Sequence, residues 1–214
     1  MSHDPLLKGS PDTLILEKFV PPELHLLLGV VDKLLTELLR NAFLTNVKGK
    51  QFMSTFLQKN NIKEGEKRGG KLEGNSCHGV LDIVDLLERD LKDYSLESYL
   101  IGLPFIQTMR LFKKVVHKTF GMEVIDGWEV DIENFDTSYR SLQSTKGTPI
   151  TIPPKVHIVT QHIKDFLDMK GDGKGLGFWS EQATEACHAN FKKIWDLSLI
   201  HISEPTRPLY ISYA

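Results

Sequence analysis

The sequence predicts an all-α fold, an irregular bundle of six or seven helices with one loop rich in glycine and charge. Two observations carry this prediction. Apolar residues recur at intervals of three and four along most of the chain, which is the spacing of amphipathic helices. No succession of alternating apolar and polar residues precedes these segments, so we expect no sheet.

The composition is that of an ordinary globular protein, and it shows no excess of basic residues of the kind that binds nucleic-acid phosphates. The 214 residues suffice for one sizeable domain or two small ones, 41% of them are hydrophobic, and the formal net charge is -2. Proteins that grip a nucleic acid usually carry a basic excess. Contact with DNA is therefore expected only locally, or through regions that this chain lacks.

The N-terminal residues show no basic segment followed by an apolar core, and no apolar run is long enough to span a bilayer. We expect an intracellular protein with no membrane partner, and we favour the nucleus. Two cysteines fit a reducing compartment, and each is followed by histidine, at Cys77-His78 and Cys187-His188. Adjacent side chains diverge by about 100° on a helix, which favours ordinary buried thiols over a Cys2His2 zinc site.

The strongest helix is predicted at 21–43, after an extended N-terminal segment at 1–20. Two prolines suit its first turn, and the leucines that follow are spaced by three and four. Leu26 and Val30 widen the apolar stripe, so we expect this helix to be buried on much of its surface. A second, short helix is predicted at 50–60.

A loop rich in glycine and charge is predicted at 62–76. It offers nothing to bury, and we expect it to be mobile. Its basic residues could touch nucleic acid, but three glutamates dilute them, which favours a solvated loop. The basic residues are Lys63, Lys67, Arg68 and Lys71.

Three further helices are predicted at 76–94, 96–121 and 126–145. The second is expected to kink or break at Pro104 and to stop at Gly121. The third has four candidate core positions, Val130, Phe135, Tyr139 and Leu142.

An extended stretch at 146–155 leads into a helix at 155–170, whose beginning also fits a strand. His157 and His162 are five residues apart, a poor spacing for one helical face, so packed or hydrogen-bonded histidines are favoured. The loop at 171–177 has four glycines but lacks the ending of a phosphate-binding loop.

The last predicted helix, at 180–195, carries the candidate site. Glu181, Glu185 and His188 lie within about 60° of one another on one face, where carboxylates and an imidazole could hold a metal ion. The pattern favours the alternative, an ordinary polar face whose acids meet the positive end of the helix dipole. A di-iron site would need a second Glu-x-x-His element, and no motif of a hydrolase, protease, kinase or dehydrogenase is present.

The final residues, 197–214, show neither a helical nor a strand period. Their sequence, LSLIHISEPTRPLYISYA, resembles the conceptual translation of a tagmentation adapter. LSLIHI matches the transposon mosaic end and SEPTR matches the adapter that follows it. One leftover base and a sample index of eight bases then fill three codons, here Pro208, Leu209 and Tyr210, and the next adapter stretch matches the final four residues in the same frame. We therefore exclude this tail from the helical domain, which is expected at 21–196 and to be cut near Asp196.

Four segments together resemble the C-terminal region of transposon-like proteins in invertebrate genomes, over about residues 14–196. The segments are PPELHLLLGVVDKLLTELL, LEGNSCHGVLDIVDLLE, TIPPKVHIVTQHI and GLGFWSEQATEACHANFKKIW. Such proteins resemble cut-and-paste DNA transposases, with an RNase-H-like core, three metal-binding acids and a helical insertion before the last acid.

This resemblance implies phosphoryl transfer assisted by two Mg²⁺ ions, with Glu181 as the first candidate for the last acid and Glu185 as the second. The strands that should carry the first two acids are missing here, so the fragment is expected to be catalytically inactive alone. The alternatives are a host helical scaffold or interaction protein and, less favoured, a metal-dependent helical enzyme. Exposed apolar helix faces would promote self-association.

Overall fold

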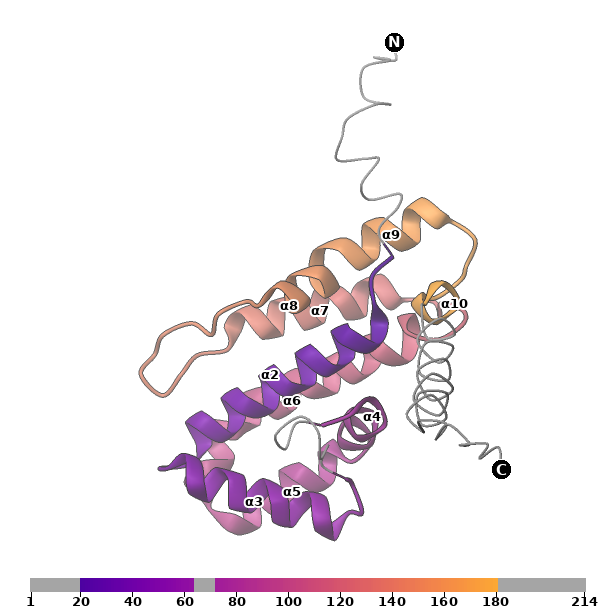
Figure 1. The fold of residues 1–214 in the computed structure, drawn as a ribbon. Coiled ribbons are helices and arrows are strands. Elements are labelled where there is room, and N and C mark those ends of the chain that lie inside the picture. The colour runs from indigo at the N-terminus through magenta and orange to yellow at the C-terminus, as the bar shows by residue number, and fades with distance from the viewer. Residues whose placement is uncertain (1–19, 64–71, 181–214) are drawn as a thin grey trace, which may run out of the picture. The chain divides into compact units, whose positions relative to one another are not determined.

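A computed structural model describes residues 20–63 and 72–180, and it confirms the all-α prediction (Figure 1). The chain divides into two compact units, 1–179 and 180–214, and the helices given below all belong to the first. Within the described residues no strand forms, and pairing is limited to isolated bridges at Glu123–Lys174 and Gln143–Pro149. The helices are α2 Glu23–Ala42, α3 Asn46–Lys59, α4 Gly74–Asp82, α5 Val84–Tyr94, α6 Leu96–Thr119, α7 Trp128–Ser141, α8 Pro154–His157, the π-helical turn η3 Ile158–His162, α9 Ile163–Lys170 and α10 Leu176–Trp179.

The centre of the bundle is the pair α2 and α6, which lie side by side (Figure 1). Helices α3, α4 and α5 pack on one side of this pair, and α7, α8, η3 and α9 pack on the other. The apolar stripe of α2 is wide, as predicted, because Leu26 and Val30 are buried together with Leu27, Leu34 and Leu38. Full burial of one such side chain contributes about 1.5–3 kcal/mol, so this helix anchors the fold.

The predicted break at Pro104 does not occur, because α6 continues through it. Proline removes one backbone hydrogen bond and costs about 3 kcal/mol inside a helix. Here Pro104 is exposed, so water can satisfy the freed carbonyl group. The residues that follow bury one whole face of α6, which offsets the cost. They are Phe105, Ile106, Met109 and Phe112, each at most 1% exposed.

The predicted core of α7 is correct except at one position. Phe135, Tyr139 and Leu142 are buried, but Val130 is 58% exposed. The buried stripe of α7 begins at Trp128 and proceeds in steps of four, three and four residues, which leaves Val130 on the opposite face.

Several predicted boundaries also moved, since α3 begins at Asn46 instead of residue 50 and α7 ends at Ser141 instead of residue 145. The single helix predicted at 76–94 is two helices, because the backbone turns at Ile83, which caps α4 and precedes α5. Helix α4 begins at Gly74, inside the predicted loop, and Leu72 is buried just before it. The loop is therefore shorter than predicted, because its last residues bury an apolar side chain and enter α4.

The segment predicted as a helix with a strand-like beginning is helical throughout, as α8, η3 and α9. The predicted extended stretch forms no helix over 146–153, whereas Pro154 and Lys155 already belong to α8. Tyr139 Oη donates a hydrogen bond to the Thr151 carbonyl oxygen at 3.1 Å. None of the helices in residues 20–63 and 72–180 combines the length and the apolar character needed to cross a bilayer.

Candidate functional site

The three residues of the predicted site, Glu181, Glu185 and His188, lie outside the described residues. The same holds for Cys187, for the tail at 197–214, and for the N-terminal segment except Val20. Three features of the described bundle bear on function: the segment that leads to Glu181, the metal-binding potential of the bundle, and a groove between α3 and α5.

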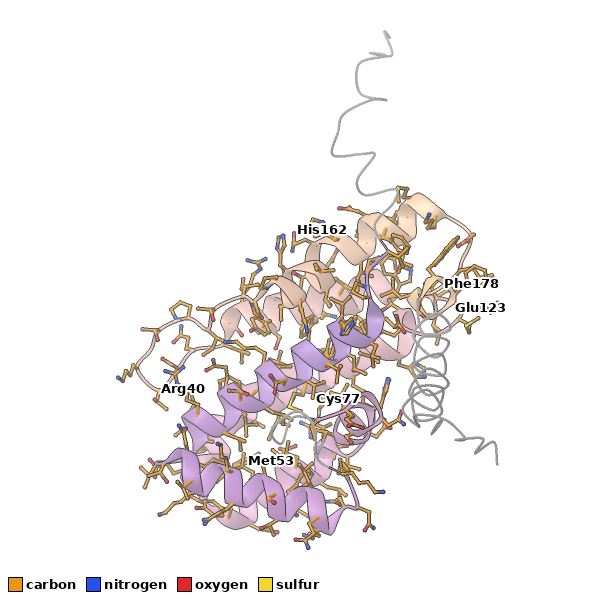
Figure 2. The ribbon with its side chains drawn as sticks, viewed as in Figure 1. Arg40, Met53, Cys77, Glu123, His162 and Phe178 are labelled. Atoms are coloured by element: carbon orange, nitrogen blue, oxygen red, sulfur yellow. The ribbon has the colours of Figure 1, made fainter. Side chains whose placement is uncertain are left out.

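The glycine-rich segment before Glu181 is fastened to the turn that joins α6 and α7. Three backbone hydrogen bonds of 3.0 Å connect them, Val124 N–H to the Gly173 carbonyl, Gly175 N–H to the Met122 carbonyl and Gly177 N–H to the Gly121 carbonyl. Lys174 Nζ adds an ion pair with Glu123 Oε1 at 3.0 Å. Figure 2 shows Glu123 and Phe178 close together at this end of the bundle. The segment is therefore a structural clasp.

The glycines of the clasp are needed for close approach of two backbones. A Cβ atom at Gly175 would lie 2.4 Å from the Gly121 carbonyl oxygen, and one at Gly177 would lie 2.7 Å from the Phe120 carbonyl oxygen. Gly171 and Gly173 have φ angles of 59° and 71°, in the left-handed region that side chains disfavour. The sequence predicted a loop without phosphate-binding character, but the packing that requires its glycines is long-range and was missed.

Within the described residues, the surroundings of Cys77 do not form a metal site of three or more ligands. Among residues 20–63 and 72–180 no group of three or more His, Cys, Asp or Glu side chains could hold a metal ion. Burial, and to a lesser extent Asp32, raises the pKa of the Cys77 thiol to about 12, so it stays protonated at neutral pH. Cys77 is buried and His78 is exposed, so this pair diverges as predicted for a helix.

A groove of about 570 Å³ lies between α3 and α5, and its floor is aromatic. Phe52 and Tyr94 line it, with ring centroids 5.6 Å apart, and each ring also contacts Phe43, at 5.1 and 5.0 Å. A second cavity of about 630 Å³ adjoins it between α2 and α6, and the two share Lys48 and Tyr94. We call these two neighbouring hollows the aromatic groove.

The two edges of the aromatic groove carry opposite charges. Lys48 and Lys59 stand on the α3 edge, and Asp90 and Asp93 stand on the α5 edge. Lys59 Nζ and Asp90 Oδ2 form an ion pair of 2.9 Å that ties α3 to α5. None of these residues was singled out from the sequence, because α3 and α5 are separated by the predicted loop and their pairing leaves no local signal.

Exposed apolar side chains surround the same end of the bundle. The turn between α2 and α3 exposes Leu44, which is 88% accessible, and the first turn of α3 exposes Val47. The first turns of α6 expose Leu96 and Leu100. Single exposed apolar residues are ordinary, but several beside one apolar hollow are typical of an interaction surface.

The acidic residues of α5 that face α6 are engaged in holding the helices together. Arg110 forms ion pairs with Asp85 and Glu88, and Glu88 also accepts a hydrogen bond of 3.1 Å from Tyr99 Oη. Likewise Lys33 pairs with Glu37 at 2.8 Å on α2. These carboxylates are neutralised by fixed partners, which suits a structural role.

Comparisons with models of protein families, with curated proteins and with solved structures each found no match.

Proposed function

We propose that the described bundle is a non-catalytic helical interaction module that pairs with a second copy of itself through the aromatic groove. The observation that carries this proposal is the aromatic floor of the groove, bordered by exposed apolar side chains at the same end of the bundle. Burial of such surface against another protein is favourable at about 25 cal/mol per Å².

The charges on the groove edges favour a second copy as the occupant. A twofold rotation about an axis parallel to the groove sets the α3 edge of one copy against the α5 edge of the other. Lys48 then faces the partner's Asp93, and Asp93 faces the partner's Lys48, so both edges gain an opposite charge. An occupant of one charge sign would meet repulsion at one edge.

Sedimentation velocity of the full chain over an about hundredfold range of concentration tests this proposal. Val47→Glu should weaken self-association at least about tenfold, which is about 1.4 kcal/mol. The matched control is Val130→Glu, which alters a valine of similar exposure on α7 and should leave association unchanged. Lys48→Glu should weaken pairing and Asp93→Lys should restore it in the double variant. A wild-type chain that stays monomeric, or variants that all behave alike, would refute the proposal.

We further propose that this module belongs to a transposon-derived parent that resembles an RNase-H-like DNA transposase. The sequence resemblance supports this proposal. Glu181 or Glu185 would be the last of three acids, with His188 on the same face, and bound Mg²⁺ would stabilise charge on a phosphate. A metal pair needs further acids, so the chain alone should be catalytically inactive.

Genomic sequence upstream of Met1 and beyond Asp196 tests the proposed parent most directly. Two acids on predicted strands upstream, and many near-identical genomic copies, are the expected result. A single spliced copy without such strands would instead favour a host scaffold protein. DNA is a partner of the parent in this proposal, and the nucleus is its place of action.

A further inference from the structure

The π-helical turn η3 brings two histidines together that the sequence spacing had set apart. Five residues along an α-helix differ in direction by about 140°, so His157 and His162 would point apart. In η3 the N–H of Ile163 donates to the carbonyl of Ile158, five residues earlier, and the wider turn stacks such residues. The ring centroids of His157 and His162 are 5.0 Å apart and their planes are nearly perpendicular. The two rings therefore pack together, as favoured from the sequence, although their spacing in an ideal α-helix would set them on different faces.

The distance between the rings suits a shared metal ion. Two imidazoles bound to one tetrahedral ion, each through a nitrogen about 2 Å from the metal, have ring centroids about 5 Å apart. His162 Nδ1 is buried and has no hydrogen-bond partner, which is unusual for an imidazole nitrogen. His157 is exposed, so its ring can rotate toward an ion without displacing core residues. Figure 2 shows His162 on the α8–η3–α9 segment.

The charged groups packed beside η3 balance one another. On α7, Asp136 Oδ2 accepts a hydrogen bond of 3.5 Å from Gln161, the residue before His162. Glu133, one turn earlier on α7, lies 3.9 Å from Lys164. Arg140 also pairs with Asp136, at 2.9 Å, so each of these two acids has a basic partner. The net charge of the four groups is zero, and the case for a bound ion rests on the two histidines themselves.

We propose that His157 and His162 form a two-histidine site for a borderline divalent transition metal, of which Zn²⁺, Ni²⁺ and Cu²⁺ are the candidates. Imidazole is a preferred ligand of these ions, and water would complete the coordination. The bound ion would hold the π-helical turn closed and so stiffen the link between α8 and α9. The site differs from the predicted Glu181, Glu185 and His188 face and is independent of pairing through the aromatic groove.

The test is isothermal titration of the full chain with Zn²⁺, Ni²⁺ and Cu²⁺ in turn, at pH 7.5 and again at pH 5.5. At least one of the ions should bind with one ion per chain at the higher pH, and binding should weaken at the lower pH because protons compete for both imidazoles. His157→Gln should weaken the affinity at least about tenfold, as loss of one of two ligands requires. Because His157 is exposed, this variant should keep the fold, which circular dichroism checks.

Two control variants separate this site from others. His117→Gln alters an exposed histidine in the last turn of α6 and should bind the ion as the wild type does. His188→Gln removes the histidine of the predicted C-terminal face and should also bind normally. The proposal is overturned if none of the three ions binds, if His157→Gln binds as tightly as the wild type, or if only His188→Gln loses affinity.

Discussion

Replacement of Gly175 by alanine should open the clasp that holds residues 171–179 on the turn between α6 and α7. The added Cβ would lie 2.4 Å from the Gly121 carbonyl oxygen and 3.0 Å from that of Thr119. An ordinary contact begins at 3.4 Å, so the two backbones must separate by about 1 Å (3.4 minus 2.4). Both obstructing atoms belong to the backbone and cannot rotate away, unlike the end of a flexible side chain.

The cost of this separation follows from the contacts it breaks. The hydrogen bonds from Gly175 to Met122 and from Gly177 to Gly121 would lengthen, at about 0.5–1.5 kcal/mol each. Leu176 is fully buried between them and would lose part of its packing, a further 1 kcal/mol or so. We therefore expect a destabilisation of about 2–4 kcal/mol, confined largely to this segment.

Amide hydrogen exchange and urea denaturation together measure the effect. The Gly177 amide should exchange about 30- to 1000-fold faster in Gly175→Ala, as the free energy above requires. Gly121→Ala is the matched control, since its added Cβ would meet only the Glu123 carbonyl oxygen at an ordinary 3.7 Å. Equal protection of the Gly177 amide in the two variants would refute the steric reasoning.

Three further predictions concern the bundle as a whole. Pro104→Ala should raise the free energy of unfolding by about 1–3 kcal/mol in urea denaturation, because the exposed position regains a backbone donor; a lowered value would mean that the proline is required. Cys77 should resist iodoacetamide at pH 8 in the native state and react once the protein is unfolded, as mass spectrometry of the labelled peptide will show; fast labelling of the native protein would contradict its burial. Because the pKa of its thiol rises from 9.0 to about 12 on folding, its contribution to stability should be present below pH 9 and disappear as the pH rises to about 12, which pH-dependent melting measures. Deletion of Leu197–Ala214 should leave the thermal midpoint of the bundle within about 2 °C of the full chain, whereas a larger fall would show that the tail supports the fold.

Helix content was predictable because it rests on local spacing. The stripe of α2 and the core positions Phe135 and Tyr139 recur at three and four residues, and any helix with that pattern must bury the same face. Val130 was misassigned because valine is apolar wherever it stands, and only the phase set by Trp128 and Ile132 shows which face of α7 it occupies. Hydrophobicity identifies the candidates for the core, but the helix that packs against α7 determines which of them are buried.

The candidate sites divide in the same way. Glu181, Glu185 and His188 were found from spacing on one predicted helix, and they remain a prediction. The aromatic groove was not found, because it joins α3 to α5 across a loop. His157 and His162 were singled out, but the π-helical turn that places them on one face was not predicted. The spacing of apolar residues along one helix does not show which distant helix packs against it, nor where a turn widens from the α-helical to the π-helical form.

The order of residues alone decides that this chain is helical, since apolar side chains at three- and four-residue intervals can share a face only on a helix. Long-range packing decides the rest. It keeps α6 continuous through Pro104, it demands glycine where the clasp meets the turn after α6, and it widens one turn so that His157 and His162 meet. In each case the free energy of a local conformational preference, a few kcal/mol, opposes the free energy gained by burying several side chains, and the larger of the two determines the conformation.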